Sequence, residues 1–104
     1  SSALVEHQAR LVQGVADAAL LVTEVTSGRS VLAWVAMPEV DTASVTVELE
    51  QILSKTFNGW RPTQYIVVDA FPYTASAKVQ KHLLKDHIAR LHEDDVALTP
   101  NSSC

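Results

Sequence analysis

The sequence is poor in several residue types, and each scarcity excludes a kind of structure. Cysteine occurs once, as the final residue Cys104, so the chain can form neither an internal disulfide nor a cluster of thiolate metal ligands. Glycine occurs three times, at Gly14, Gly28 and Gly59, and these positions are too far apart for a G-x-G-x-x-G or Walker-type loop. The fold must therefore rest on side-chain packing, and no phosphate cradle is made from glycine alone.

Long apolar runs are also missing. No run approaches the roughly 20 residues that span a bilayer, and Ser1-Ser2 begins neither a basic signal region nor a transit peptide. We therefore expect a soluble, cytoplasmic protein with no membrane span. Its 104 residues, 47% apolar and 19% charged, suit one small domain with one core. Such a domain has little room to enclose a nucleotide together with a second substrate, which disfavours a self-sufficient two-substrate enzyme.

The charges are few and unevenly distributed. A net charge of −4 argues against nucleic-acid binding, which needs a surplus of lysine and arginine. Residues 1–52 contain two basic side chains against seven acidic ones, whereas residues 53–92 contain six basic against two acidic. An anionic ligand is therefore expected to approach the later half of the chain.

Hydrophobic periodicity predicts six elements of secondary structure. They are a helix over 3–13, strands over 18–25 and 30–37, a helix over 43–57, a strand over 64–69 and a helix over 79–93. The first two strands are expected to form a hairpin or a neighbouring antiparallel pair. The order α-β-β-α-β-α indicates an α+β fold, a small three-stranded sheet covered by helices. Residues 94–104 show no sustained periodicity and are predicted to form a flexible tail after a domain of residues 1–93.

The most unusual local sequence is the segment 71–81, Phe-Pro-Tyr-Thr-Ala-Ser-Ala-Lys-Val-Gln-Lys. Pro72 lacks a backbone N–H and ends the preceding strand, while Thr74 and Ser76 can bond neighbouring amides in a tight turn. The pattern predicts a loop that carries Lys78 into the last helix. By residue type alone Lys78 is most simply a solvated surface lysine. At the tip of a loop its ammonium is also placed to meet a carboxylate or phosphate.

The longer segment 65–81 resembles the closing motif of the adenylate-forming superfamily, which includes acyl-CoA synthetases, luciferases and peptide-synthetase adenylation domains. In that family a strand ending in V-D-x-[LF]-P is followed by x-T-x-[ST]-G-K-[IV] and a basic, leucine-bearing helix. The match is close from Asp69 onward. The order and spacing of the upstream elements extend the resemblance over residues 4–93, to the mobile C-terminal subdomain of that superfamily.

The resemblance implies that Lys78 is the adenylation lysine, whose ammonium bridges the substrate carboxylate and the ATP α-phosphate. The family makes acyl-AMP from a carboxylic acid and ATP with Mg, then transfers the acyl group to a thiol. The continuation Val79-Gln80-Lys81 is more similar to acyl-CoA synthetases than to peptide-synthetase domains and favours coenzyme A as acceptor. The N-terminal adenylation domain would be the partner, and the isolated chain is expected to be inactive.

Two residues depart from the family pattern. Ala77 stands where the family usually has glycine, which would introduce strain if that position needs a positive φ. Tyr73 replaces the frequent Arg, Lys or Leu. A different class of function also stays open: a stand-alone, non-catalytic module of the same fold that binds a partner protein or an acidic carrier domain.

The remaining candidates have simpler interpretations. The four histidines are His7, His82, His87 and His92. The last three are spaced by five and do not share one helix face, so we expect surface histidines and no metal site. Trp34 is expected in the core and Trp60 beneath a loop. Lys81, Lys85 and Arg90 would either contact coenzyme A phosphates or form a solvated basic face, and Ser76 is expected to make a turn hydrogen bond rather than act as a nucleophile.

Overall fold

Three helices and three strands follow one another in the predicted order α-β-β-α-β-α, in a computed structural model that describes residues 1–24 and 28–98. The elements are α1 (Ser2–Arg10), β1 (Val15–Glu24), β2 (Arg29–Ala36), α2 (Thr42–Thr56), β3 (Gln64–Val68) and α3 (Lys81–Leu98). The α+β fold class is confirmed. Contacts group the chain into two compact units, Ser1–Phe71 and Pro72–Cys104, and each is described separately.

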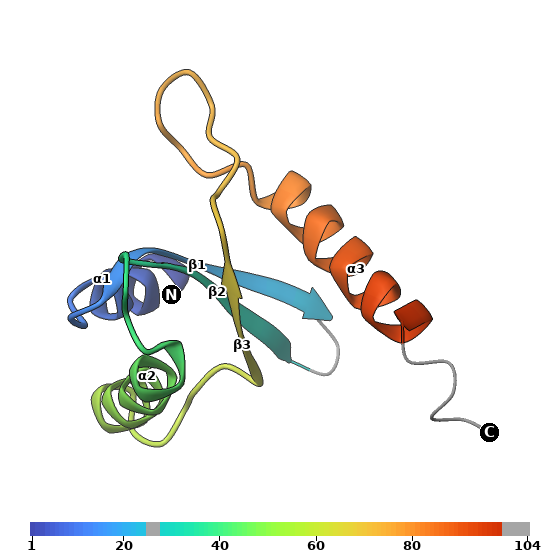
Figure 1. Cartoon of the computed structure of the whole chain (residues 1–104). Coiled ribbons are helices and arrows are strands. Elements are labelled where there is room, and N and C mark those ends of the chain that lie inside the picture. The colour runs from blue at the N-terminus through green and yellow to red at the C-terminus, as the bar shows by residue number, and fades with distance from the viewer. Residues whose placement is uncertain (25–27, 99–104) are drawn as a thin grey trace. The chain divides into compact units, whose positions relative to one another are not determined.

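The sheet belongs to the first unit and has the order β1-β2-β3 (Figure 1). β1 and β2 form the expected antiparallel pair, in which Ala19 lies opposite Ala33. β2 and β3 are parallel, with Val31 opposite Gln64. Parallel neighbours need a crossover connection, and α2 supplies it.

The core of the first unit lies between one face of this sheet and the two helices α1 and α2. The helices contribute apolar residues four positions apart, which places them on one face of each helix. The buried cluster consists of Val5, Ala9, Val12, Val15, Ala18, Leu20, Leu32, Trp34, Val45, Leu49 and Leu53. Trp34 is completely buried, as predicted.

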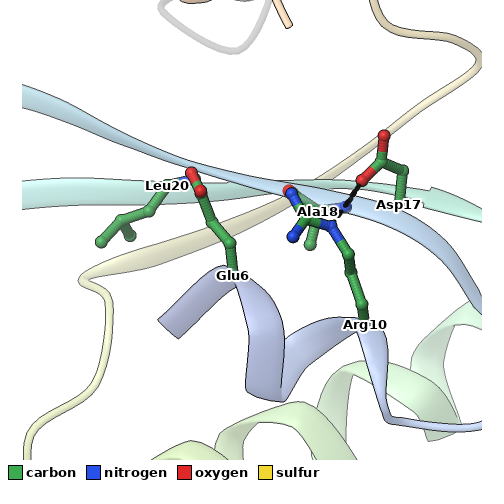
Figure 2. Close-up of polar contacts among 5 residues, drawn as sticks. All are labelled: Glu6, Arg10, Asp17, Ala18 and Leu20. Atoms are coloured by element: carbon green, nitrogen blue, oxygen red, sulfur yellow. Dashed lines mark hydrogen bonds and ion pairs between the residues drawn. The ribbon is translucent and has the colours of Figure 1, made fainter. Parts of the chain in front are cut away.

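Side chains of α1 cover the outer edge of β1 (Figure 2). The Glu6 carboxylate Oε2 accepts a hydrogen bond from the Leu20 N–H at 2.8 Å, and Arg10 Nη2 donates to the Ala18 carbonyl at 3.2 Å. Asp17 Oδ1 accepts from both the Ala18 N–H and Arg10 Nε, each at 2.8 Å. Backbone groups that an edge strand would leave open are thus paired with side chains, which protects the edge from pairing with another strand.

Gly14 forms the corner between α1 and β1. Its φ of +99° is in the left-handed region, and a Cβ atom there would lie 3.0 Å from Val45 Cγ2 and 3.2 Å from Val40 Cγ1. The Gly14 carbonyl also accepts a hydrogen bond from the Met37 N–H at 2.9 Å. Only glycine meets both the conformational and the spatial requirement, which explains one of the three glycines in the chain.

Several boundaries differ from the prediction. α1 ends at Arg10 instead of residue 13, because the chain must turn at Gly14 into a strand that already begins at Val15. α3 begins at Lys81 and continues to Leu98, five residues beyond the predicted end and into the segment predicted as a tail. Residues 99–104 of that tail lie outside the described residues. Within residues 1–24 and 28–98, no helix combines the length and apolar content that crossing a bilayer requires.

Two side chains lie elsewhere than expected. Glu6 is one of the seven acidic residues of the first half, for which a solvated position is the usual expectation, yet it is only 9% exposed because it accepts a hydrogen bond from the edge of β1. Trp60 is 42% exposed and does not pack beneath a loop as predicted. Its ring meets Phe57 edge-on instead, with the ring centroids 6.3 Å apart.

Candidate functional site

The Lys78 loop is a narrow hairpin at the start of the second unit. Tyr73 and Val79 form an antiparallel bridge, and outside it the Gln80 N–H donates to the Pro72 carbonyl at 2.8 Å. Inside it the Thr74 N–H donates to the Lys78 carbonyl, also at 2.8 Å. Val79 takes part in this bridge, so the helix starts only at Lys81. Lys78 therefore lies on the returning arm of a closed loop, three residues before the start of α3 at Lys81.

The tip of the loop is a turn that contains a strained alanine. The Ala77 N–H donates to the Thr74 carbonyl at 2.9 Å, which closes a turn over residues 74–77. Ala77 has a φ of 66°, in the left-handed region. A residue with a Cβ atom there costs roughly 1–2 kcal/mol, whereas glycine adopts the conformation freely. The position thus does need a positive φ, and the alanine stores strain beside Lys78.

Hydroxyl groups complete the loop. Thr74 Oγ1 accepts a hydrogen bond from the Lys78 N–H at 3.1 Å and lies 3.1 Å from Ser76 Oγ, so that one hydroxyl donates to the other. Ser76 therefore makes the turn hydrogen bond that the sequence predicted. Together these contacts pair both the N–H and the C=O of Lys78 with Thr74.

The Lys78 side chain itself is exposed. In the part of the chain that the structure describes, its ammonium makes no hydrogen bond or ion pair. The backbone is held while the charge is left available to a group from outside this unit. A lysine with three donors on a flexible stem can then bind a phosphate or carboxylate oxygen.

Further positive charge follows Lys78 on α3. Lys81 and Lys85 are four positions apart and share one side of the helix. The first turn of α3 contains no acidic residue to offset the positive end of the helix dipole. The start of the second unit therefore favours anions, in line with the charge distribution of the sequence.

The described histidines form no metal centre. His7, His82 and His87 are exposed, and residues 1–24 and 28–98 contain no group of three or more His, Cys, Asp or Glu side chains placed to hold a metal ion. The side chain of His92 lies outside what the structure describes.

Of the residues singled out from the sequence, Thr74, Ser76 and Lys78 are brought together in one loop, whereas Asp69 belongs to the first unit.

No family model and no curated protein sequence matches the chain. Solved structures do match it. The Klebsiella oxytoca protein NpsA in complex with 3-hydroxyanthranilyl-AMSN matches with a TM-score of 0.70 and 26% identity, over 86% of this chain and 17% of that chain. An acyl-CoA synthetase from Brucella canis matches with a TM-score of 0.72 and 23% identity, over 86% of this chain and 18% of that chain. The amide bond synthetase McbA from Marinactinospora thermotolerans gives a TM-score of 0.69 at 23% identity, over 82% and 18%. The chain thus spans less than a fifth of each protein.

Proposed function

Because the chain has the fold of a segment of adenylate-forming enzymes, we propose that it is the C-terminal subdomain of an ATP-dependent acyl-CoA ligase. One observation carries this proposal: the backbone of Lys78 is fixed in a closed loop while its side chain is exposed. In this proposal residues 1–93 form the subdomain, and an N-terminal domain binds the carboxylic acid and ATP with its Mg. The complete enzyme is cytoplasmic.

Lys78 acts in the first half-reaction. An oxygen of the substrate carboxylate forms a bond to the α-phosphorus of ATP as the bond from that phosphorus to the departing pyrophosphate breaks. Negative charge concentrates on the α-phosphate oxygens, and the Lys78 ammonium stabilises it while also holding the carboxylate in line. The lysine neither gains nor loses a proton in this step, so its contribution is charge and position.

The second half-reaction belongs to the acceptor. The thiol loses its proton to solvent, its sulfur forms a bond to the acyl carbon of acyl-AMP, the bond from that carbon to the phosphate oxygen of AMP breaks, and a thioester and AMP result. We propose coenzyme A as the thiol because Val79-Gln80-Lys81 is similar to the sequence of acyl-CoA synthetases. In this proposal Lys78 has no part in this step, because its role is to stabilise the charge that builds on the α-phosphate oxygens as pyrophosphate departs.

The test separates the two half-reactions in the natural polypeptide that carries this chain. We expect Lys78→Ala to slow pyrophosphate release with a panel of carboxylic acids by roughly 10²–10³-fold, the usual effect of removing one group that stabilises a developing oxyanion. Thioester formation from supplied acyl-AMP should survive. Lys55→Ala, which removes an exposed lysine of α2, is the matched control and should leave both rates unchanged. Equal loss of both half-reactions in Lys78→Ala would refute the assignment.

A non-catalytic module is the second candidate, because the chain spans only 17–18% of the enzymes that it resembles. Such a module would use the exposed cations of α3 to bind an acidic partner or carrier domain. The intact mass of the source protein separates the two functions. A polypeptide several hundred residues longer favours the ligase, whereas a mass near 11.3 kDa favours the module.

A further inference from the structure

We infer that Thr74 is a positioning residue for Lys78, and that its importance arises from the alanine at position 77. This inference rests on the proposed role of Lys78. Thr74 makes contacts with the backbone at three points: its N–H to the Lys78 carbonyl, its hydroxyl to the Lys78 N–H, and its carbonyl to the Ala77 N–H. One residue therefore holds both peptide groups that flank the Lys78 Cα.

Fixing both peptide groups fixes the direction in which the Lys78 side chain leaves the backbone. The Cα–Cβ bond is set by the two flanking peptide planes, and each of these planes is hydrogen-bonded to Thr74. The side chain is exposed, and within residues 1–24 and 28–98 its ammonium makes no hydrogen bond or ion pair that would orient it. Its starting direction must then come from the backbone, and among the described residues it is the Thr74 hydroxyl that hydrogen-bonds this backbone from a side chain.

The alanine makes this contact necessary. Alanine favours negative φ, yet Ala77 has a φ of 66°, so the turn tends to relax toward a conformation that would carry the Lys78 N–H away from its present place. The hydrogen bond from Lys78 to the Thr74 hydroxyl opposes this relaxation. A glycine at position 77 would not push the loop out of the left-handed conformation and would depend less on the hydroxyl.

Two variants distinguish the hydroxyl from the shape of the side chain. Thr74→Val keeps the branched shape and removes the hydroxyl, whereas Thr74→Ser keeps the hydroxyl. In the 104-residue chain we expect the Lys78 amide proton to exchange with solvent roughly fivefold faster in Thr74→Val, as the loss of one ordinary hydrogen bond predicts. Thr74→Ser should exchange as the original chain does. This measurement needs no catalytic activity and so stands apart from the proposed function.

The kinetic readout uses the natural polypeptide that carries the chain. Thr74→Val should lower kcat for acyl-AMP formation by between about 10- and 100-fold with little change in KM for ATP, because the lysine is misplaced and not lost. Thr74→Ser should restore the rate, and thioester formation from supplied acyl-AMP should be unchanged in both. In an Ala77→Gly background the effect of Thr74→Val should shrink, since the strain that the hydroxyl opposes is gone.

The outcomes separate the two ideas. If Lys78→Ala forms acyl-AMP normally, the proposed function fails, while the exchange data still decide whether Thr74 holds the loop. If Thr74→Val leaves exchange at Lys78 unchanged, the positioning role is overturned. It is also overturned if Thr74→Ser forms acyl-AMP as slowly as Thr74→Val does, because the side chain would then act through its shape and not its hydroxyl. A third contrary result is faster amide exchange at Lys78 in Thr74→Val with an unchanged rate of acyl-AMP formation, in an enzyme that requires Lys78.

Discussion

The Glu6 carboxylate lies 2.8 Å from the backbone nitrogen of Leu20 and accepts its hydrogen bond, so a helix side chain takes the place that a neighbouring strand would fill. Arg10, one turn further along α1, donates a hydrogen bond to the Ala18 carbonyl at the same edge of the sheet. A buried acidic residue is costly unless it is paired, and Glu6 is paired with the edge of the sheet. The acidic first half of the sequence therefore includes a structural carboxylate.

Removing this carboxylate should destabilise the fold. We expect Glu6→Ala to lower the free energy of unfolding by about 1–3 kcal/mol, because the Leu20 N–H would remain buried without an acceptor. Glu6→Gln keeps an acceptor oxygen and should lose less. Glu48→Ala removes an exposed glutamate from α2 and is the matched control. Urea denaturation measures all three, and equal stability of Glu6→Ala and the original chain would contradict the role.

Because Ala77 is strained, two alanine-to-glycine substitutions in the same loop should change the free energy of unfolding in opposite directions. Ala77→Gly relieves the left-handed alanine and should raise the free energy of unfolding by up to about 1 kcal/mol, after the entropic cost of glycine is subtracted. Ala75→Gly, at a position without positive φ, incurs only that cost and should lower stability by roughly 0.5–1 kcal/mol. Urea midpoints compare them, and a destabilised Ala77→Gly would show that the alanine is not strained.

Asp41 gives a pH dependence at the acid end. It caps α2, and hydrogen bonds from the Ser44 hydroxyl and the Ala43 N–H hold the pKa of its carboxyl below the ordinary value of 3.8. Because the pKa of this carboxyl is lower in the folded state than in the unfolded state, its charged form stabilises the fold at pH values above the unfolded-state pKa. This stabilisation is lost as the pH falls through the folded-state pKa. Asp41→Ala should therefore be less stable than the original chain at pH 6 and approach it near pH 2. A difference that persists unchanged at low pH would contradict the assignment.

Tyr65 should make the stability of the fold depend on pH in the alkaline range. Burial raises the pKa of its hydroxyl to about 12, nearby Glu50 adds to the effect, and Arg61 opposes it. The hydroxyl oxygen is buried and has no hydrogen-bond partner among the described residues. A raised folded-state pKa means that the stability contribution is complete below pH 10 and is lost as the pH rises toward 12.

Tyr65→Phe should remove that loss. The variant keeps the ring, lacks the unpaired hydroxyl, and should be at least as stable as the original chain at pH 7. Between pH 10 and 12 its unfolding midpoint in urea should fall less steeply. An identical alkaline profile for the two proteins would show that Tyr65 does not titrate with folding.

The sequence predicts the elements better than their contacts. Apolar periodicity is sufficient for the order of helices and strands, and the hydroxyls around Lys78 indicate a tight loop before any contact is known. The sequence does not show that Glu6 turns inward, because a glutamate on a short amphipathic helix is expected to be exposed to solvent. Only the position of the β1 edge beside α1 shows that its carboxylate is buried and paired. It also does not give the φ of Ala77, because alanine favours negative φ and the left-handed value of 66° is known only once the turn closed by Thr74 is seen.

The hydrogen bonds of the Lys78 loop have a consequence for the order in which the chain folds. All of them join residues at most eight positions apart, from Pro72 to Gln80, whereas the sheet must bring together Ser30 and Thr63, which are 33 positions apart. Local contacts of this kind form on the microsecond timescale of a hairpin, and the closure of a long parallel crossover is slower. The lysine-bearing loop can therefore take its shape before the sheet is complete, with its geometry encoded in nine consecutive residues.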